Sequence, residues 1–118
     1  MEFFLVYIRE AHPMGEPDRR GRVGIRKEAP GGGGHGAIPL PKTEEERHAA
    51  AKKCVDGLEL SIPTLVDSMD NAANYAYGAW PDRMYVIGVD GNIAYGGEPG
   101  PWGFDAEAWA AAIHDVAK

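Results

Sequence analysis

An acid and an imidazole stand two residues apart near the amino terminus, at Glu10 and His12. They follow Phe3–Ile8, a run of six apolar residues without alternation. Such a run is typical of a strand that is buried on both faces of a parallel sheet. Ligands of open α/β sheets gather at the carboxyl ends of these strands. We therefore interpret Glu10 and His12 as a proton-handling pair at that edge, the alternative for His12 being a purely structural histidine.

Composition excludes several classes of function. The chain has 118 residues, 44% of them apolar, which is enough for one domain with a single core. A net charge of −6 argues against a general nucleic-acid or membrane-surface binder. No apolar run approaches the roughly 18 residues of a membrane span, and no secretory signal is recognisable. With one cysteine the chain can form no internal disulfide, so we expect a cytoplasmic protein.

Residues 13–42 predict a long irregular insertion within a single domain that spans residues 1–118. The segment is rich in proline and basic residues and contains the glycine run Gly31–Gly34. One interpretation is a solvated connection without a role of its own. The other is an active-site lid or an anion-contacting loop, because long loops in compact domains are often functional.

Local signals predict the remaining elements. Thr43 and Glu46 form the pattern of a capping box, so a helix begins at Thr43, and Gly57 is a plausible end. Its apolar face is expected to carry four residues: Ala51, Cys54, Val55 and Leu58. We interpret Cys54 on this face as a small buried hydrophobe rather than a reactive thiol.

The second half of the chain adds two strands, a hairpin turn and two helices. Pro63 introduces a short strand, and Asp90-Gly91 is a strong hairpin signal. The expected elements after the first helix are a strand at 62–67, a short helix at 72–77, strands at 84–89 and 92–95, and a last helix capped by Asp105.

This order, β-α-β-(short α)-β-β-α, is the α/β pattern of a thioredoxin-like fold that lacks its first strand and first helix. In that fold the missing strand lies between the strands at 3–8 and 63–66, so both would expose unpaired backbone groups. The gap could be filled by upstream residues, by a strand from a second copy, or by a rearranged sheet. Pro63 resembles the cis-proline turn of such proteins, with an ordinary strand-starting proline as the alternative.

Several blocks of sequence occur in an order that points to a family. They are Phe4–His12, Glu46-Arg47, Ala49–Ala51, Pro63–Asn71, Tyr77–Ile87 and Tyr95–Phe104. With these blocks the chain resembles the iodothyronine deiodinase family, thioredoxin-fold selenoenzymes or thiol enzymes that remove iodine reductively from iodinated phenols. The family's turn with a cysteine or selenocysteine nucleophile has no counterpart here, so the chain is expected to be an N-terminally truncated, bacterial-type homologue. A selenocysteine codon read as a stop, followed by a start at Met1, would explain both absences.

The resemblance implies roles for four residues. Tyr7 and His12 would help to protonate the leaving phenol near the nucleophile, and Glu10 would assist their hydrogen bonds. Arg83 would bind the acidic end of the substrate, because a guanidinium fork suits a carboxylate. From the residues alone, core packing for Tyr7 and a surface ion pair for Arg83 are the alternatives.

The implied activity is that of a deiodinase-like thiol or selenol oxidoreductase, acting by reductive dehalogenation or peroxide-type chemistry. We expect a halogenated phenol or a peroxide as substrate, an external thiol as reductant, no cofactor, and no metal, since the histidine spacings match no ligand pattern. Pro41 replaces a histidine of the family's Ile-Pro-x-His block, so iodothyronine itself is not the expected substrate. The printed chain, without its nucleophile, is expected to be inactive. The alternative is a non-catalytic thioredoxin-like binding module that forms a homodimer through an exposed strand.

Overall fold

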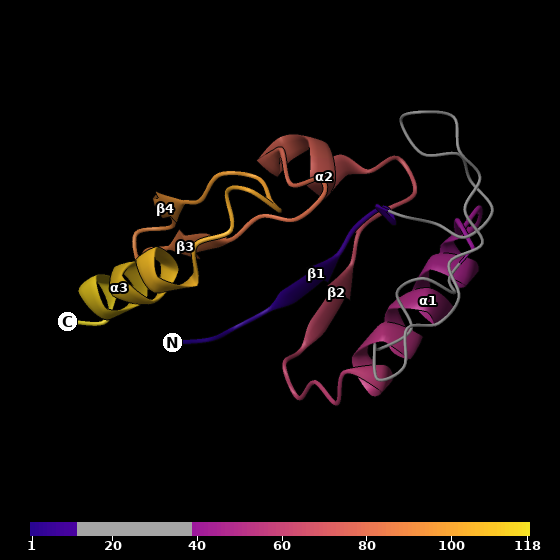
Figure 1. The fold of residues 1–118 in the computed structure, drawn as a ribbon, viewed down its shortest axis with the longest axis horizontal. Coiled ribbons are helices and arrows are strands. Elements are labelled where there is room, and N and C mark those ends of the chain that lie inside the picture. Colours follow the sequence, from indigo (N-terminus) through magenta and orange to yellow (C-terminus); the bar gives the residue numbers. More distant parts are fainter. Residues whose placement is uncertain (12–38) are drawn as a thin grey trace. The chain divides into compact units, whose positions relative to one another are not determined.

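The computed structural model describes residues 1–11 and 39–118, which form a mixed α/β structure with two short sheets and three helices (Figure 1). The elements are β1 (Leu5–Tyr7), α1 (Glu44–Gly57), β2 (Thr64–Val66), α2 (Ala72–Tyr77), β3 (Tyr85–Ile87), β4 (Ile93–Gly96) and α3 (Ala106–Val116). Their order confirms the predicted one. They divide into two compact units, Glu2–Ala72 and, together with Met1, Ala73–Lys118, which are described separately. His12 and the predicted insertion up to residue 38 lie outside the described residues.

In the first unit, β1 and β2 pair directly with each other as parallel strands (Figure 1). Val6 stands opposite Leu65 in the register, and the Asp67 N–H donates to the Tyr7 carbonyl oxygen at 2.9 Å beyond the ladder. The gap expected between these strands is therefore closed within the described residues. Of the three ways to fill it, the rearranged sheet is observed, because direct pairing gives the facing backbone groups their hydrogen bonds.

The prediction that the first strand is buried on both faces is also wrong. Helix α1 packs against β2, and Leu5 and Tyr7 are half-buried. On alternate positions Val6 is 42% exposed and Leu65 is 54% exposed. Because side chains of a strand alternate between its faces, one helix covers only every second residue. The ladder is also shorter than the predicted range of 3–8.

Helix α1 begins with the predicted cap. The Glu46 N–H donates to Thr43 Oγ1 at 3.1 Å, while the Glu46 carboxylate accepts from the Lys42 N–H at 2.7 Å instead of from the cap residue itself. The helix ends at Gly57, as predicted. Its buried residues are Arg47, Ala50 and Ala51, and Cys54 and Val55 on the same face are half-buried, so the predicted face is covered except at Leu58, which is exposed.

The second unit is a hairpin with a helix packed on it. Strands β3 and β4 are antiparallel, and Asp90 Oδ1 accepts from the Asn92 N–H at 3.0 Å in the turn, which confirms the predicted hairpin. Asp105 caps α3 by accepting from the Ala108 N–H at 2.9 Å, as predicted. Trp109 of α3 donates its Nε1–H to the Tyr85 carbonyl oxygen at 3.1 Å and so attaches the helix to β3.

The proline that introduces β2 is not preceded by a cis bond. Among the described residues, the cis peptide bonds precede Pro81 and Pro101. The carbonyl oxygen of Pro63 accepts from the Leu5 N–H at 3.0 Å, at the start of the parallel ladder. The comparison of Pro63 with a cis-proline turn is therefore wrong, and the alternative of a strand-starting proline agrees with the structure.

Candidate functional site

Tyr7 and Glu10, two of the predicted site residues, meet at the carboxyl end of β1. The phenol of Tyr7 donates to Glu10 Oε2 at 2.5 Å. Tyr7 is the last residue of the strand, and the chain bends within three residues so that the carboxylate lies beside the phenol. The third predicted member, His12, lies outside the described residues. The arrangement is a phenol–carboxylate pair at the sheet edge where proton transfer was predicted.

The surroundings of Tyr7 make its phenol a weak acid. Burial raises its pKa most, and the hydrogen bond to Glu10 and that carboxylate's negative charge raise the pKa further. Cys54 adds to the rise, whereas the positive charge of Arg47 lowers the pKa. Tyr7 therefore holds its proton throughout the physiological range and releases it only to a strongly basic centre.

Cys54 of α1 belongs to the same neighbourhood, although nothing in the sequence linked it with β1. The residue is half-buried. Burial raises the pKa of its thiol, and the negative charge of Glu10 raises it further. A thiol of raised pKa is a poor nucleophile at neutral pH, because the thiolate is the reactive form. This supports the interpretation of Cys54 as a small apolar side chain.

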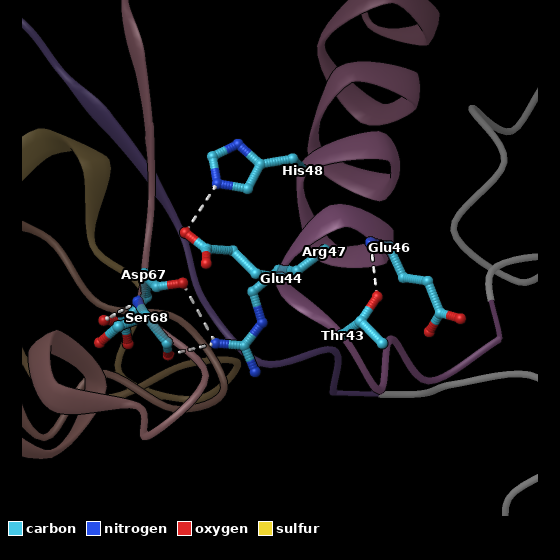
Figure 2. A network of polar contacts seen from close by, with 7 residues as sticks. All are labelled: Thr43, Glu44, Glu46, Arg47, His48, Asp67 and Ser68. Carbon is cyan, nitrogen blue, oxygen red and sulfur yellow. Dashed lines mark hydrogen bonds and ion pairs between the residues drawn. The ribbon is translucent and has the colours of Figure 1, made fainter.

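Arg47 of α1 contacts the turn that follows β2, as Figure 2 shows for Asp67 and Ser68. Its Nη1 donates to the carbonyl oxygens of Ser68 at 2.7 Å and Asp67 at 3.4 Å, and Nη2 donates to Asn71 Oδ1 at 2.9 Å. The residue is 3% exposed, and within the described residues its Nε has no hydrogen-bond partner.

Sequence reasoning assigned no role to Arg47, although a signal was present. Residues three and four positions apart share one face of a helix. Arg47 has this spacing to Ala50 and Ala51, which are both buried. An arginine on the same helix face as small apolar residues indicates a buried guanidinium that donates to a specific acceptor.

Arg83, the predicted substrate-binding residue, lies in the second unit. Its Nε donates to the Gly97 carbonyl oxygen at 2.5 Å, and Nη1 donates to the carbonyl oxygens of Tyr77 at 3.2 Å and Gly78 at 3.4 Å. Its guanidinium carbon lies 5.2 Å from the centre of the Tyr85 ring. These contacts join the end of α2 to the hairpin. The role in substrate binding stays a prediction.

Two kinds of feature are missing from the part of the chain that the structure describes. Residues 1–11 and 39–118 contain no group of three or more histidine, cysteine, aspartate or glutamate side chains placed to hold a metal ion. No helix within these ranges has the length and apolar character required to cross a membrane.

Comparison with known proteins identifies relatives along almost the whole chain. The model of the iodothyronine deiodinase family matches residues 1–114. The chain is 31% identical over 106 residues to a type I iodothyronine deiodinase of Xenopus laevis, covering 90% of this chain and 36% of that protein. It is 36% identical over 105 residues to a thyroxine 5-deiodinase of Gallus gallus, covering 87% of this chain and 34% of that protein. The chain thus spans about a third of the length of these relatives. No solved structure matches it significantly.

Proposed function

Because the chain belongs to the iodothyronine deiodinase family, we propose that it acts as a thioredoxin-like thiol or selenol oxidoreductase that removes halogen reductively from halogenated phenols. The observation that carries the proposal is the contact of Tyr7 with Glu10 at the carboxyl end of a parallel strand. Reductive removal of halogen from an aromatic ring needs a proton for the ring carbon. A phenol–carboxylate pair can supply and direct that proton.

The proposed reaction balances as follows. A selenol or thiol attacks the halogen, so the carbon–halogen bond breaks, its electron pair stays on the carbon, and the carbon takes a proton. The resulting selenium–halogen or sulfur–halogen bond is reduced by external thiol. In sum, an aryl halide and two thiols give the dehalogenated phenol, a disulfide, a halide ion and a proton.

The raised pKa of Tyr7 suits this role. The phenol stays protonated at neutral pH, so its proton is available to the strongly basic carbanion that develops on the ring. Glu10, which accepts from the phenol, orients it and assists its reprotonation. On the family resemblance we also propose His12 as a further proton carrier and Arg83 as the group that binds the acidic end of the substrate.

We assign the attack on halogen to a selenol or thiol that the printed sequence does not contain. The chain has one cysteine, and burial and Glu10 raise the pKa of its thiol. The external thiol places the reaction in a reducing compartment such as the cytoplasm.

The proposal can be tested by measuring iodide release from 2,6-diiodophenol with dithiothreitol. The protein would be produced with any residues that its gene encodes in frame before Met1. We expect turnover in the wild type and a loss of about 100-fold in kcat for Tyr7→Phe and Glu10→Gln, which is the usual contribution of a proton-transfer group.

The matched control for that experiment is Tyr75→Phe. Tyr75 is 73% exposed, so the variant removes the same hydroxyl group from an exposed side chain to which the proposal assigns no role. It should keep wild-type turnover. Equal rates for Tyr7→Phe and Tyr75→Phe would contradict the proposed role of the pair.

A second candidate function is a binding module that associates through the sheet of β1 and β2. The observation in its favour is the exposure of Val6 and Leu65, which stand opposite each other in the parallel register. Light scattering of the purified protein tests it. The double change of Val6 and Leu65 to threonine should convert a dimer into a monomer, and a wild-type monomer would contradict this candidate.

A further inference from the structure

Arg47 carries a positive charge into the covered side of α1. It is 3% exposed, and its neighbours on the same face, Ala50 and Ala51, have small apolar side chains. Burying an ion is costly unless hydrogen bonds and nearby opposite charges compensate the lost hydration. The hydrogen-bond acceptors of Arg47 therefore identify the segment that this buried guanidinium holds in place.

Those acceptors all belong to the turn after β2. The planar fork of Arg47 reaches the carbonyl oxygens of Asp67 and Ser68 and the side-chain oxygen of Asn71. Asn71 has a φ of 60°, a left-handed conformation that asparagine tolerates better than most residues. A single guanidinium thus fixes three points of a five-residue turn from a distant element, through two separated nitrogens that a lysine ammonium does not have.

The same turn is attached to the strand that carries the phenol–carboxylate pair. The Asp67 N–H donates to the carbonyl oxygen of Tyr7 at 2.9 Å, while the Asp67 carbonyl oxygen accepts from Arg47. We call the hydrogen bonds of Arg47 to Asp67, Ser68 and Asn71 the clamp. Asp67 therefore connects the clamp to the end of β1.

Arg47 is also coupled to Tyr7 through its charge. Among the groups that act on the phenol, Glu10 and Cys54 raise its pKa and the guanidinium lowers it. The geometric route through Asp67 ends at the backbone carbonyl oxygen of Tyr7, and the electrostatic route acts on the Tyr7 phenol, so both lead to the same residue.

We propose that Arg47 is a positioning residue of the Tyr7–Glu10 pair, which holds the Asp67–Asn71 turn against the end of β1 and supplies the positive charge beside the pair. The inference rests on the function proposed above for Tyr7 and Glu10. It gives α1 a task in the site itself, in addition to covering one face of the sheet.

Two measurements that need no turnover test the proposal. The first is hydrogen exchange at the Asp67 N–H, which reports the hydrogen bond to Tyr7. The second is a 19F NMR titration of protein labelled with a fluorinated tyrosine whose phenol is acidic enough to titrate while the protein is folded. The Tyr7 signal is assigned by its absence in Tyr7→Phe.

The variants separate the two routes. Arg47→Met removes both the hydrogen bonds and the charge. We therefore expect hydrogen exchange at the Asp67 N–H to become faster by about tenfold or more. The titration midpoint of Tyr7 should rise by about half a pH unit or more. Arg47→Lys keeps the charge but loses the fork, so exchange should rise while the midpoint stays close to wild type. Lys52→Met removes an exposed charge of the same helix, and neither measurement should change.

Asn71→Gly keeps the proposal testable where Arg47→Met does not fold. Glycine accepts the left-handed backbone but removes one acceptor of the clamp, so Asp67 exchange should rise. Unchanged exchange in both Arg47→Lys and Asn71→Gly overturns the geometric route, and an unchanged midpoint in folded Arg47→Met overturns the electrostatic one. Because neither readout depends on catalysis, an inactive protein would overturn the proposed function without touching this result.

Discussion

At the residue scale, the site brings together groups whose charges oppose one another. Glu10 makes both neighbours, the phenol of Tyr7 and the thiol of Cys54, harder to ionise. Arg47 acts in the opposite direction on the phenol. Burial raises the pKa of Tyr7 most, and one carboxylate and one guanidinium from different elements then shift it in opposite directions.

The thiol of Cys54 should react slowly with alkylating reagents. We expect its rate with iodoacetamide at pH 8 to lie below that of an unhindered cysteine, because burial and Glu10 both raise its pKa. Glu10→Gln should increase the rate severalfold, since it removes the negative charge. The chain has a single cysteine, so the labelling rate can be assigned directly. Glu45→Gln, an exposed acid on the same helix, is the control and should leave the rate unchanged.

The contribution of Tyr7 to stability should depend on pH in the alkaline range. Its pKa is higher in the folded than in the unfolded chain, where it is 10.0, so the stabilisation is complete below pH 10 and is lost as the pH rises further. Urea unfolding should show Tyr7→Phe to be less stable than wild type by about 1 kcal/mol at pH 7, the usual net value of a hydrogen bond. The difference in free energy of unfolding between wild type and Tyr7→Phe should become smaller above pH 10. A difference that widens there would contradict the raised pKa.

At the element scale, short signals in the sequence decide where helices and turns begin and end. Thr43 and Asp105 accept from the backbone N–H three residues further on, and both helices begin there. Gly91 adopts a φ of 81° in the hairpin turn, where most residues are strained. These interactions join residues close in sequence, so they could be predicted.

The pairing and burial of these elements were predicted less well, because they depend on contacts between distant residues. Val6 pairs directly with Leu65, which lies far along the chain, and no local pattern specifies this pairing. The burial of Arg47 on α1 was not predicted for the same reason, because its acceptors lie beyond β2. Of the candidate site, the Tyr7–Glu10 contact agrees with the sequence-based expectation, whereas the influence of Glu10 on Cys54 and the contacts of Arg47 with the turn after β2 were not predicted.

Two glycines provide a matched test of backbone strain. An added Cβ would meet no atom within 4 Å at either Gly57 or Gly91, but only Gly91 has a positive φ. Gly91→Ala should therefore lower the free energy of unfolding by about 1–2 kcal/mol. Gly57→Ala should leave it unchanged or raise it by up to about 1 kcal/mol, because alanine favours the helix. Thermal unfolding of the two variants would decide the matter, and equal destabilisation would contradict the assignment to φ.

At the scale of the whole molecule, the described residues bury little apolar surface. Their buried apolar side chains are Ala50, Ala51 and Val86, and no large side chain among them is completely buried. Larger apolar side chains, such as Phe4 at 57% and Ile93 at 56%, are exposed. The stability of a chain of this size depends on the apolar area removed from water, so we expect a small free energy of unfolding.

Calorimetry should reveal this small core. We expect a broad unfolding transition with a heat-capacity change below the usual ~12–15 cal/mol/K per residue, because that quantity reports apolar surface exposed on unfolding. The double change of Val6 and Leu65 to threonine should leave the change in heat capacity almost unaltered, since both side chains are already exposed. A sharp transition of ordinary heat capacity would show that these side chains are covered in solution.

The direct parallel ladder of β1 and β2 also has a consequence for synthesis. Its two strands are separated by about 60 residues of chain. At roughly 5–20 residues per second, the ribosome releases the first strand several seconds before the second exists. During that interval β1 lacks the strand with which it pairs in the folded unit, so its backbone groups are open to chaperones or to other nascent chains. The order of synthesis therefore exposes this apolar segment for several seconds before its partner strand exists.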